Sequence, residues 1–221
     1  MNPVLPRAAP FIVFVATLAI EPMVDDVARS FDQDPRWWYA LRVALVLGLL
    51  VWFRKSYAEL GALPGLRAVD WLLAIALGAA IFVLWINLDI KLLTFGGAPG
   101  YDPRSQLGAT DFGLAASRLV GATLVIPIAE ELFWRSFLLR WLKRRDFLEV
   151  IPSDAGFRPL AMSALLFGLE HDLWFAGLLA GLGYGWAYMH TRSLWIAIGA
   201  HAVTNAMLGV WVLTTGNWQF W

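Results

Sequence analysis

Two adjacent glutamates and a nearby arginine lie inside a long apolar stretch of the chain. Glu130 is twelve residues from Leu142, where that stretch ends, which corresponds to about 18 Å along an α-helix. If the stretch crosses a bilayer, each charge near the centre costs about 2.5–3.5 kcal/mol or more, so these groups must face a bundle interior. Buried ion pairs rarely persist for stability alone. The cluster therefore indicates a functional site, with a buried pair that only fixes helix register as the alternative.

The spacing of these three residues separates their roles. Glu131 and Arg135 are four residues apart, so they share a helix face and can form an ion pair. Glu130 is turned by about 100° from Glu131 and lacks that partner. One carboxylate is therefore expected to be held by the arginine, while the other is available as a general base.

Two further polar pairs occur in later apolar segments. Phe167 and His171 are one helical turn apart, and so are His201 and Asn205. The second pair can donate hydrogen bonds toward a single point, which is the geometry of an oxyanion hole. His171 by itself fits a catalytic role or a packing role equally well.

Carboxylates and imidazoles also raise the question of a metal. The Glu-x-x-His pairs of metal-binding bundles and the His-Glu-x-x-His zinc motif are absent from the sequence. Glu130, His171 and His201 could supply three zinc ligands and leave a position for water. We expect no metal and no other cofactor, and zinc is the alternative. A serine nucleophile is not expected, because no Gly-x-Ser-x-Gly motif is present.

The composition is that of an integral membrane protein. Of the 221 residues, 59% are apolar and 15% charged, whereas soluble domains have about 25% charged residues. Thirteen Trp and fourteen Phe suit lipid-facing surfaces and interfacial belts. The net charge of zero gives no electrostatic basis for binding nucleic acid. The absence of cysteine excludes disulfides and thiolate sites.

The apolar segments predict an all-α, polytopic transmembrane helix bundle. A helix that crosses about 30 Å of hydrocarbon needs about 20 residues. This gives about seven spans, with six or eight as alternatives, within a single membrane domain over residues 1–221. The predicted spans are Ala8–Val24, Trp37–Phe53, Trp71–Leu93, Gly113–Leu142, Pro159–His171, Leu173–Met189 and Leu194–Thr214. The fifth is too short to cross alone.

Charged residues near the span ends predict the orientation, because short cytoplasmic loops are enriched in Lys and Arg. With seven spans, nine such residues fall on one side: Arg7, Arg54, Lys55, Arg67, Lys143, Arg144, Arg145, Arg158 and Arg192. Three fall on the other side: Arg29, Arg36 and Arg104. The amino terminus is therefore predicted to be cytoplasmic, and the membrane is the cytoplasmic one if the protein is prokaryotic. Some other charges should reach the interface from span ends: Arg42, Arg118, Asp70, Asp89 and Lys91.

The three motifs together resemble those of a known family. Glu130-Glu131-x-x-x-Arg135, Phe167-x-x-x-His171 and His201-x-x-x-Asn205 occur in the order seen in CAAX prenyl protease-type intramembrane glutamic endopeptidases. That family includes CAAX proteases and bacteriocin-processing enzymes. The resemblance covers about residues 113–210, which we take as the catalytic core.

The resemblance implies a role for each motif residue. Glu130 would activate a water for attack on a peptide carbonyl, and His171 would hold that water. His201 and Asn205 would stabilise the oxyanion, without an obligatory metal. The supporting residues would be Glu131, Arg135 and Phe167.

These roles predict an intramembrane endopeptidase whose partners are the lipid bilayer and a peptide or membrane-anchored protein substrate. A non-enzymatic scaffold or immunity-type protein of the same family is the alternative. A proton-coupled transporter fits less well, because the chain is short and lacks visible inverted repeats.

Overall fold

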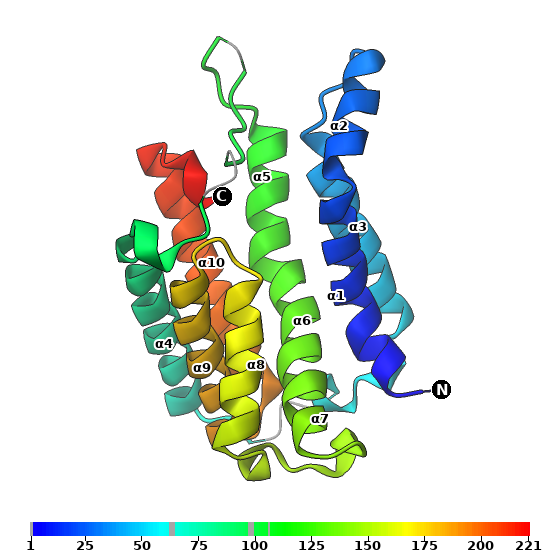
Figure 1. Ribbon diagram of the computed structural model, residues 1–221, viewed down its shortest axis with the longest axis vertical. Coiled ribbons are helices and arrows are strands. Elements are labelled where there is room, and N and C mark those ends of the chain that lie inside the picture. The colour runs from blue at the N-terminus through cyan, green and yellow to red at the C-terminus, as the bar shows by residue number, and fades with distance from the viewer. Residues whose placement is uncertain (1, 62–64, 97–99, 106) are drawn as a thin grey trace.

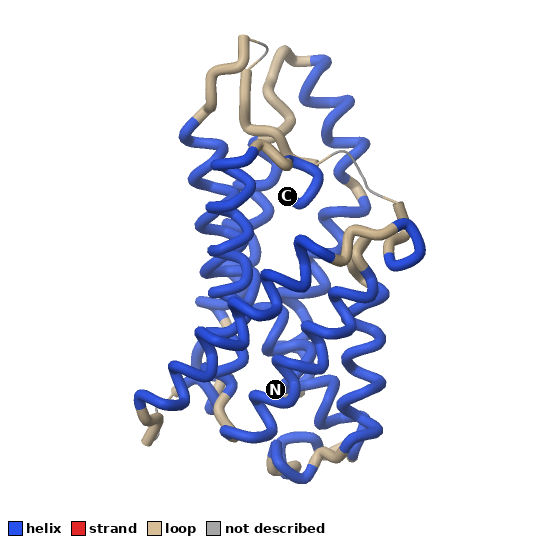
Figure 2. Tube along the Cα trace, turned by 90° about the vertical axis from the view of Figure 1, so that its left-hand side faces the viewer, coloured by secondary structure: helices blue, strands red, loops and turns tan. Residues whose placement is uncertain are grey.

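Helices form almost all of the regular structure of the chain (Figure 1). The computed structural model describes residues 2–61, 65–96, 100–105 and 107–221. Within these ranges there is no strand, and a single isolated bridge joins Arg104 to Thr110. Figure 2 shows the helices as blue tubes whose connecting loops gather toward the two ends of the bundle. The all-α prediction is confirmed.

Each predicted span contains at least one helix. The helices are α1 (Val4–Ala19), α2 (Glu21–Ser30), α3 (Trp37–Trp52), α4 (Ala68–Asn87), α5 (Phe112–Val120), α6 (Ile126–Glu131), α7 (Arg140–Lys143), α8 (Phe157–Leu169), α9 (Trp174–Thr191) and α10 (Leu194–Thr215). Short 3₁₀ turns lie at Arg54–Ser56, Ala58–Leu60, Lys91–Leu93, Phe147–Glu149, Pro152–Asp154 and Trp218–Phe220.

Three helical segments of the described chain are long and apolar enough to cross a membrane. They are α4, the continuous run Phe112–Lys143, and α10, and the bent pair of α1 and α2 makes a fourth if it counts as one span. α3 and α8 are apolar but shorter. Length and composition therefore support three or four spans, and the predicted seven are not confirmed. Large apolar side chains such as Leu72, Leu124 and Val210 are exposed on the qualifying helices, as lipid contact requires.

The first predicted span, Ala8–Val24, is not one straight helix. α1 ends at Ala19, and α2 continues from Glu21 at an angle of 56°. Pro22 lies in the first turn of α2 and has no backbone N–H to donate to the carbonyl of Leu18. The predicted span Ala8–Val24 missed this bend because it was drawn from apolar length and ran straight through Pro22.

The run Phe112–Lys143 passes through the middle of the bundle, between α1 and α3 on one side and α4, α8, α9 and α10 on the other (Figure 1). Two π-helical segments, Gly121–Val125 and Leu132–Leu139, interrupt its α-helical geometry. A π-helical segment accommodates extra residues and changes the direction of the side chains beyond it. Glu130 and Glu131 end the short α-helical stretch between the two segments, so their relative rotation is that of an α-helix.

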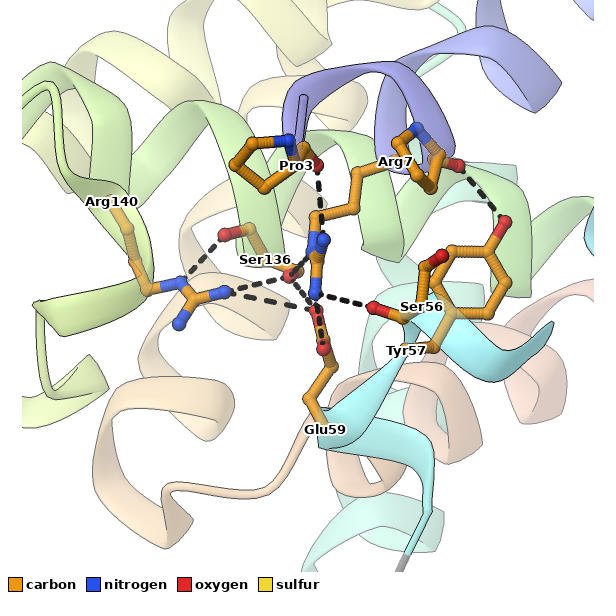
Figure 3. A network of polar contacts seen from close by, with 8 residues as sticks. Pro3, Arg7, Ser56, Tyr57, Glu59, Ser136 and Arg140 are labelled. Carbon is orange, nitrogen blue, oxygen red and sulfur yellow. Dashed lines mark hydrogen bonds and ion pairs between the residues drawn. The ribbon is translucent and has the colours of Figure 1, made fainter. Parts of the chain in front are cut away.

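The second π-helical segment is tied to the amino-terminal part of the chain by buried charges (Figure 3). Arg7, which is 2% exposed, donates to both carboxylate oxygens of Glu59 at 2.8 and 2.7 Å. Ser136 hydrogen-bonds to the same carboxylate, and Arg140 Nε donates to the Ser136 carbonyl at 2.6 Å. Arg7 was predicted in a loop. Through its hydrogen bonds to Glu59 and Ser136, the buried Arg7 side chain links α1 to the turn Ala58–Leu60 and to the helix that carries Arg135.

α8 and α9 pack with their backbones in close contact. A Cβ added at Gly181 would lie 2.8 Å from the Cα of Ala164, and one added at Gly177 would lie 3.0 Å from the Cα of Gly168. Small residues permit such approach in a membrane, where packing between helices drives association. This contact places the end of α8, with Phe167 and the following His171, beside the central helix.

Candidate active site

Glu131 and Arg135 form the ion pair that their spacing predicted. Arg135 Nε lies 3.0 Å from Glu131 Oε2, and Arg135 Nη1 donates to Oε1 at 3.0 Å. The side chains are 0% and 1% exposed, so both charges are removed from solvent. The guanidinium also lies over the ring of Phe167, with its Cζ 4.5 Å from the ring centroid. Phe167 thus supports the pair through a cation–π contact.

His201 connects the two glutamates. Its Nδ1 lies 2.9 Å from Glu131 Oε1, and its Nε2 lies 3.9 Å from Glu130 Oε2. The ring is stacked on Tyr184, with 4.9 Å between centroids. Because Glu131 Oε1 also accepts a hydrogen bond from Arg135, we assign the proton of the short contact to Nδ1 of His201. In the neutral ring with this proton on Nδ1, Nε2 has no hydrogen and can only accept. Nε2 can donate toward Glu130 only if the ring carries a proton on both nitrogens.

Glu130 is buried but makes no comparable contact. Its Oε2 has no hydrogen-bond partner within the part of the chain that the structure describes. The side chain is 5% exposed and lines a cavity of about 540 Å³. The same cavity is lined by His171, His201 and Asn205. Three sequence motifs that are distant in the chain therefore meet around one carboxylate.

His171 follows the end of α8 and is held by the backbone. Its Nδ1 lies 2.7 Å from the carbonyl oxygen of Phe167, so Nδ1 is the donor and Nε2 keeps its lone pair. The ring meets Trp85 edge-on at 5.3 Å. Its acidic sequence neighbours, Glu170 and Asp172, also line the cavity. A neutral His171 can therefore accept a hydrogen bond from a water near Glu130.

Asn205 connects α10 to the central helix. Its Nδ2 donates to the carbonyl of Ala122 at 2.8 Å, inside the first π-helical segment. An amide nitrogen carries two hydrogens, so one remains for a ligand in the cavity. His201 and Asn205 both line the cavity, as their spacing on one helix face predicted.

The residues proposed as zinc ligands do not form a metal-binding group. Among the described residues, no cluster of three or more His, Cys, Asp or Glu side chains is placed to hold a metal ion. Glu130, His171 and His201 share the cavity, but their atoms do not converge on a common point. We therefore assign no step to a metal.

Tyr184 and Thr204 were not among the predicted site residues. The Tyr184 hydroxyl donates to Thr204 Oγ1 at 2.7 Å, and Thr204 lies 2.9 Å from the carbonyl of Gly78. These two hydrogen bonds fix the Tyr184 ring on which His201 stacks. A tyrosine and a threonine in apolar helices are typical of ordinary packing, so only the tertiary contacts indicate this role.

One family model matches the chain. Residues 112–207 match the model described as Rce1-like, type II CAAX prenyl endopeptidase Rce1-like. The match begins at the first residue of α5 and ends within α10, so it contains all three motifs. No curated protein and no solved structure matches the chain.

Proposed function

Because residues 112–207 belong to the type II CAAX prenyl endopeptidase family, we propose that the protein is an intramembrane glutamic endopeptidase. Membership of a protease family implies hydrolysis of a peptide or protein substrate. The main support for the glutamic mechanism is the contrast between the two carboxylates. Glu131 is held by Arg135 and His201, whereas Glu130 lies free beside the cavity.

In the proposed reaction, Glu130 acts as a general base. It accepts a proton from a water, and the resulting hydroxide attacks the carbonyl carbon of the scissile peptide bond. The Nε2 lone pair of His171 accepts a hydrogen bond from the same water and orients it. The carboxylic acid formed at Glu130 then gives its proton to the leaving amine nitrogen as the C–N bond breaks.

His201 and Asn205 stabilise the negative charge that develops on the carbonyl oxygen. For His201 this requires the imidazolium form, whose Nε2–H points toward the Glu130 side of the cavity. Glu131 Oε1 lies 2.9 Å from Nδ1 and so orients the ring. Glu131 is therefore a positioning residue that acts through His201.

The test is cleavage by the purified full chain in detergent, with a peptide library and mass spectrometry. Glu130→Gln should lower the cleavage rate by about 10²–10⁴-fold, because general-base catalysis contributes that much. The thermal unfolding midpoint should stay near that of the wild type. Glu149→Gln, at a side chain that is 72% exposed, is the control and should cleave normally.

Three outcomes would contradict parts of the proposal. Cleavage by Glu130→Gln at the wild-type rate would exclude Glu130 as the base. Loss of wild-type cleavage after exhaustive chelation, with recovery on adding zinc, would favour the zinc-dependent alternative. If the purified wild type cleaves no peptide, and cells that carry Glu130→Gln behave like wild-type cells but unlike cells that lack the protein, a scaffold role would be favoured.

We also propose seven membrane passages with a cytoplasmic amino terminus. The direction of successive helices supports this arrangement. The amino terminus and α7 lie at one end of the bundle, and α2 and the carboxyl terminus lie at the other (Figure 1). The end with α7 carries Lys143, Arg144 and Arg145, whereas α2 at the opposite end carries Arg29.

A further inference from the structure

Two arginines near the expected span ends lie elsewhere than predicted. Arg42 and Arg118 were expected to reach the interface. Arg42 is instead 1% exposed, and both side chains line the cavity that contains Glu130. The proposed reaction uses neither of them.

Arg118 is enclosed by aromatic rings. Its Cζ lies 4.3 Å from the ring centroid of Tyr39 and 5.3 Å from that of Tyr101. Its buried Nε makes no hydrogen bond, and it has no ion pair, within the described ranges of the chain. The rings stabilise the cation from the side and leave the guanidinium edge without an anionic partner.

Arg42 lies against the same tyrosine. Its Cζ is 5.7 Å from the Tyr39 ring centroid, and its Nη2 is 2.8 Å from Oε2 of Glu21, at the bend between α1 and α2. The Glu21 side chain is 40% exposed, and the buried Nε of Arg42 has no partner among the described residues. Of the two guanidiniums, only that of Arg42 is paired, and its carboxylate partner is partly solvated.

The positive charges of Arg42 and Arg118 indicate the kind of ligand that would bind beside them. A guanidinium presents a planar array of N–H donors that matches a carboxylate or phosphate. Arg118 is partly buried and has no anionic partner among the described residues, so an anion at this wall would gain charge-assisted hydrogen bonds from its guanidinium. Four acidic side chains also line the cavity, namely Asp89, Glu130, Glu170 and Asp172. An anion would therefore be directed to the arginines and away from the catalytic groups.

The distance to Glu130 fits a peptide that occupies both places. Arg118 and Glu130 are twelve residues apart on one helical run. A regular α-helix of that length would rise roughly 18 Å, and the π-helical segment Gly121–Val125 between the two residues shortens this distance. An extended peptide advances about 3.3 Å per residue, so up to about five residues would cover it. One cavity contains both groups, so one ligand can contact both.

We propose that Arg42 and Arg118 form a subsite that binds a carboxylate of the peptide substrate, up to about five residues from the scissile bond. The carboxylate is either the peptide's carboxyl terminus or an acidic side chain. The proposal rests on the proposed function in taking the ligand to be a peptide and in placing the scissile bond at Glu130.

Binding can be measured without turnover in the Glu130→Gln protein, in phosphatidylcholine nanodiscs. The probes are pools of apolar octapeptides with a terminal carboxylate, with a terminal carboxamide, or with a carboxamide and one internal Glu. We expect at least one carboxylate pool to bind about tenfold tighter, or more, than the plain carboxamide pool. Adding Arg118→Gln should reduce its affinity to the carboxamide level, and Arg118→Lys should retain part of the preference.

Controls separate this effect from unfolding and from lipid binding. Arg29→Gln, at a side chain that is 64% exposed on α2, should keep the full preference, and thermal unfolding should show that each variant is folded. Equal binding of all pools, or no binding of any, overturns the proposal, as does an equal loss for all pools in Arg118→Gln. A preference abolished by phosphatidylglycerol nanodiscs would assign the subsite to lipid phosphate and overturn the peptide assignment.

The outcome does not depend on catalysis. Carboxylate-dependent binding without any cleavage by the wild type would leave the subsite in place and contradict the endopeptidase function. Cleavage by the wild type that is lost in Glu130→Gln, together with equal binding of the carboxylate and carboxamide pools, would support the endopeptidase function and contradict the subsite.

Discussion

Glu131 shares its carboxylate between Arg135 and His201. The first contact links residues one turn apart, and the second joins the central helix to α10. Through both, one buried anion is adjacent to two groups that can carry positive charge. In the proposed mechanism, Glu130 is the base and Glu131 positions His201, so the two adjacent glutamates would have different roles.

The first prediction concerns the charge of Glu131. Glu131→Gln keeps the shape but leaves the Arg135 guanidinium buried without its anion, which should cost about 3–5 kcal/mol. We expect a lower thermal unfolding midpoint in detergent and loss of cleavage.

Adding Arg135→Met separates the two roles of Glu131. The double variant removes the unpaired cation and should recover part of the lost stability. It should remain inactive, because His201 still lacks the carboxylate that contacts its Nδ1 and orients its ring. A double variant with wild-type cleavage would show that Glu131 serves only the ion pair.

Among the elements, the turn Ala58–Leu60 has a specific role, because Glu59 connects α1 to the second π-helical segment (Figure 3). Burial by itself raises the pKa of Glu59. Hydrogen bonds from Arg7 and Ser136 outweigh burial and lower that pKa below the ordinary 4.5. Ionised Glu59 therefore stabilises the folded state above about pH 4.5, and this contribution is lost as the pH falls through the lower folded-state pKa.

The second prediction tests this linkage with Glu59→Gln. At pH 7 the thermal unfolding midpoint should fall by roughly 3–12 °C, as expected for loss of charged hydrogen bonds in a chain of this size. The difference from the wild type should shrink as the pH drops below 4.5, where wild-type Glu59 becomes protonated. Asp26→Asn, at a carboxylate that is 84% exposed, should follow the wild type at every pH. A difference that is constant with pH would show that the charge of Glu59 is not responsible.

The third prediction concerns the contact between α8 and α9. Gly181→Ala would place a methyl group 2.8 Å from the Cα of Ala164, where only a shift of α8 can relieve the clash. Overpacking of this kind costs about 1–3 kcal/mol. It should also reduce cleavage, since Phe167 and His171 move with the end of α8.

A glycine-to-alanine change in another helix provides the control. Gly48 lies in α3, and a Cβ there would meet nothing within 4 Å. Gly48→Ala should therefore retain both activity and thermal stability. Equal effects of the two substitutions would contradict the packing explanation.

For the whole molecule, the orientation in the membrane decides which side supplies the substrate. The cavity is lined by Thr94, Leu173 and Trp221, which belong to connections and the chain end on the side of the bundle opposite α7. If the Lys and Arg bias sets the orientation, the cavity opens toward the non-cytoplasmic side.

The fourth prediction tests this orientation. The chain has no cysteine, so single cysteines can be introduced without background. In intact bacterial cells, a membrane-impermeant maleimide should label Gln33→Cys and Leu107→Cys. Lys55→Cys and Asp146→Cys should react only after permeabilisation. The reverse pattern would place the cavity on the cytoplasmic side, and a mixed pattern would contradict the seven-passage topology.

The sequence by itself predicted the helical class, the approximate positions of the helices and the pairing of Glu131 with Arg135. These features depend on local properties, namely the length of apolar segments and the four-residue spacing of a helix face. The family motifs could be identified for the same reason, since each lies within a few residues. The seven-span count went further than the helix lengths support.

Contacts between distant segments were decided only by the tertiary structure. His201 meets Glu131 across 70 positions of sequence, and Asn205 meets Ala122 across 83. Such contacts depend on how each helix is rotated, and the two π-helical segments change that rotation in a way that a regular 3.6-residue period does not predict. The turning of Arg42 and Arg118 into the cavity has the same origin, because packing of the bundle determines whether a charge near a helix end meets water or the interior.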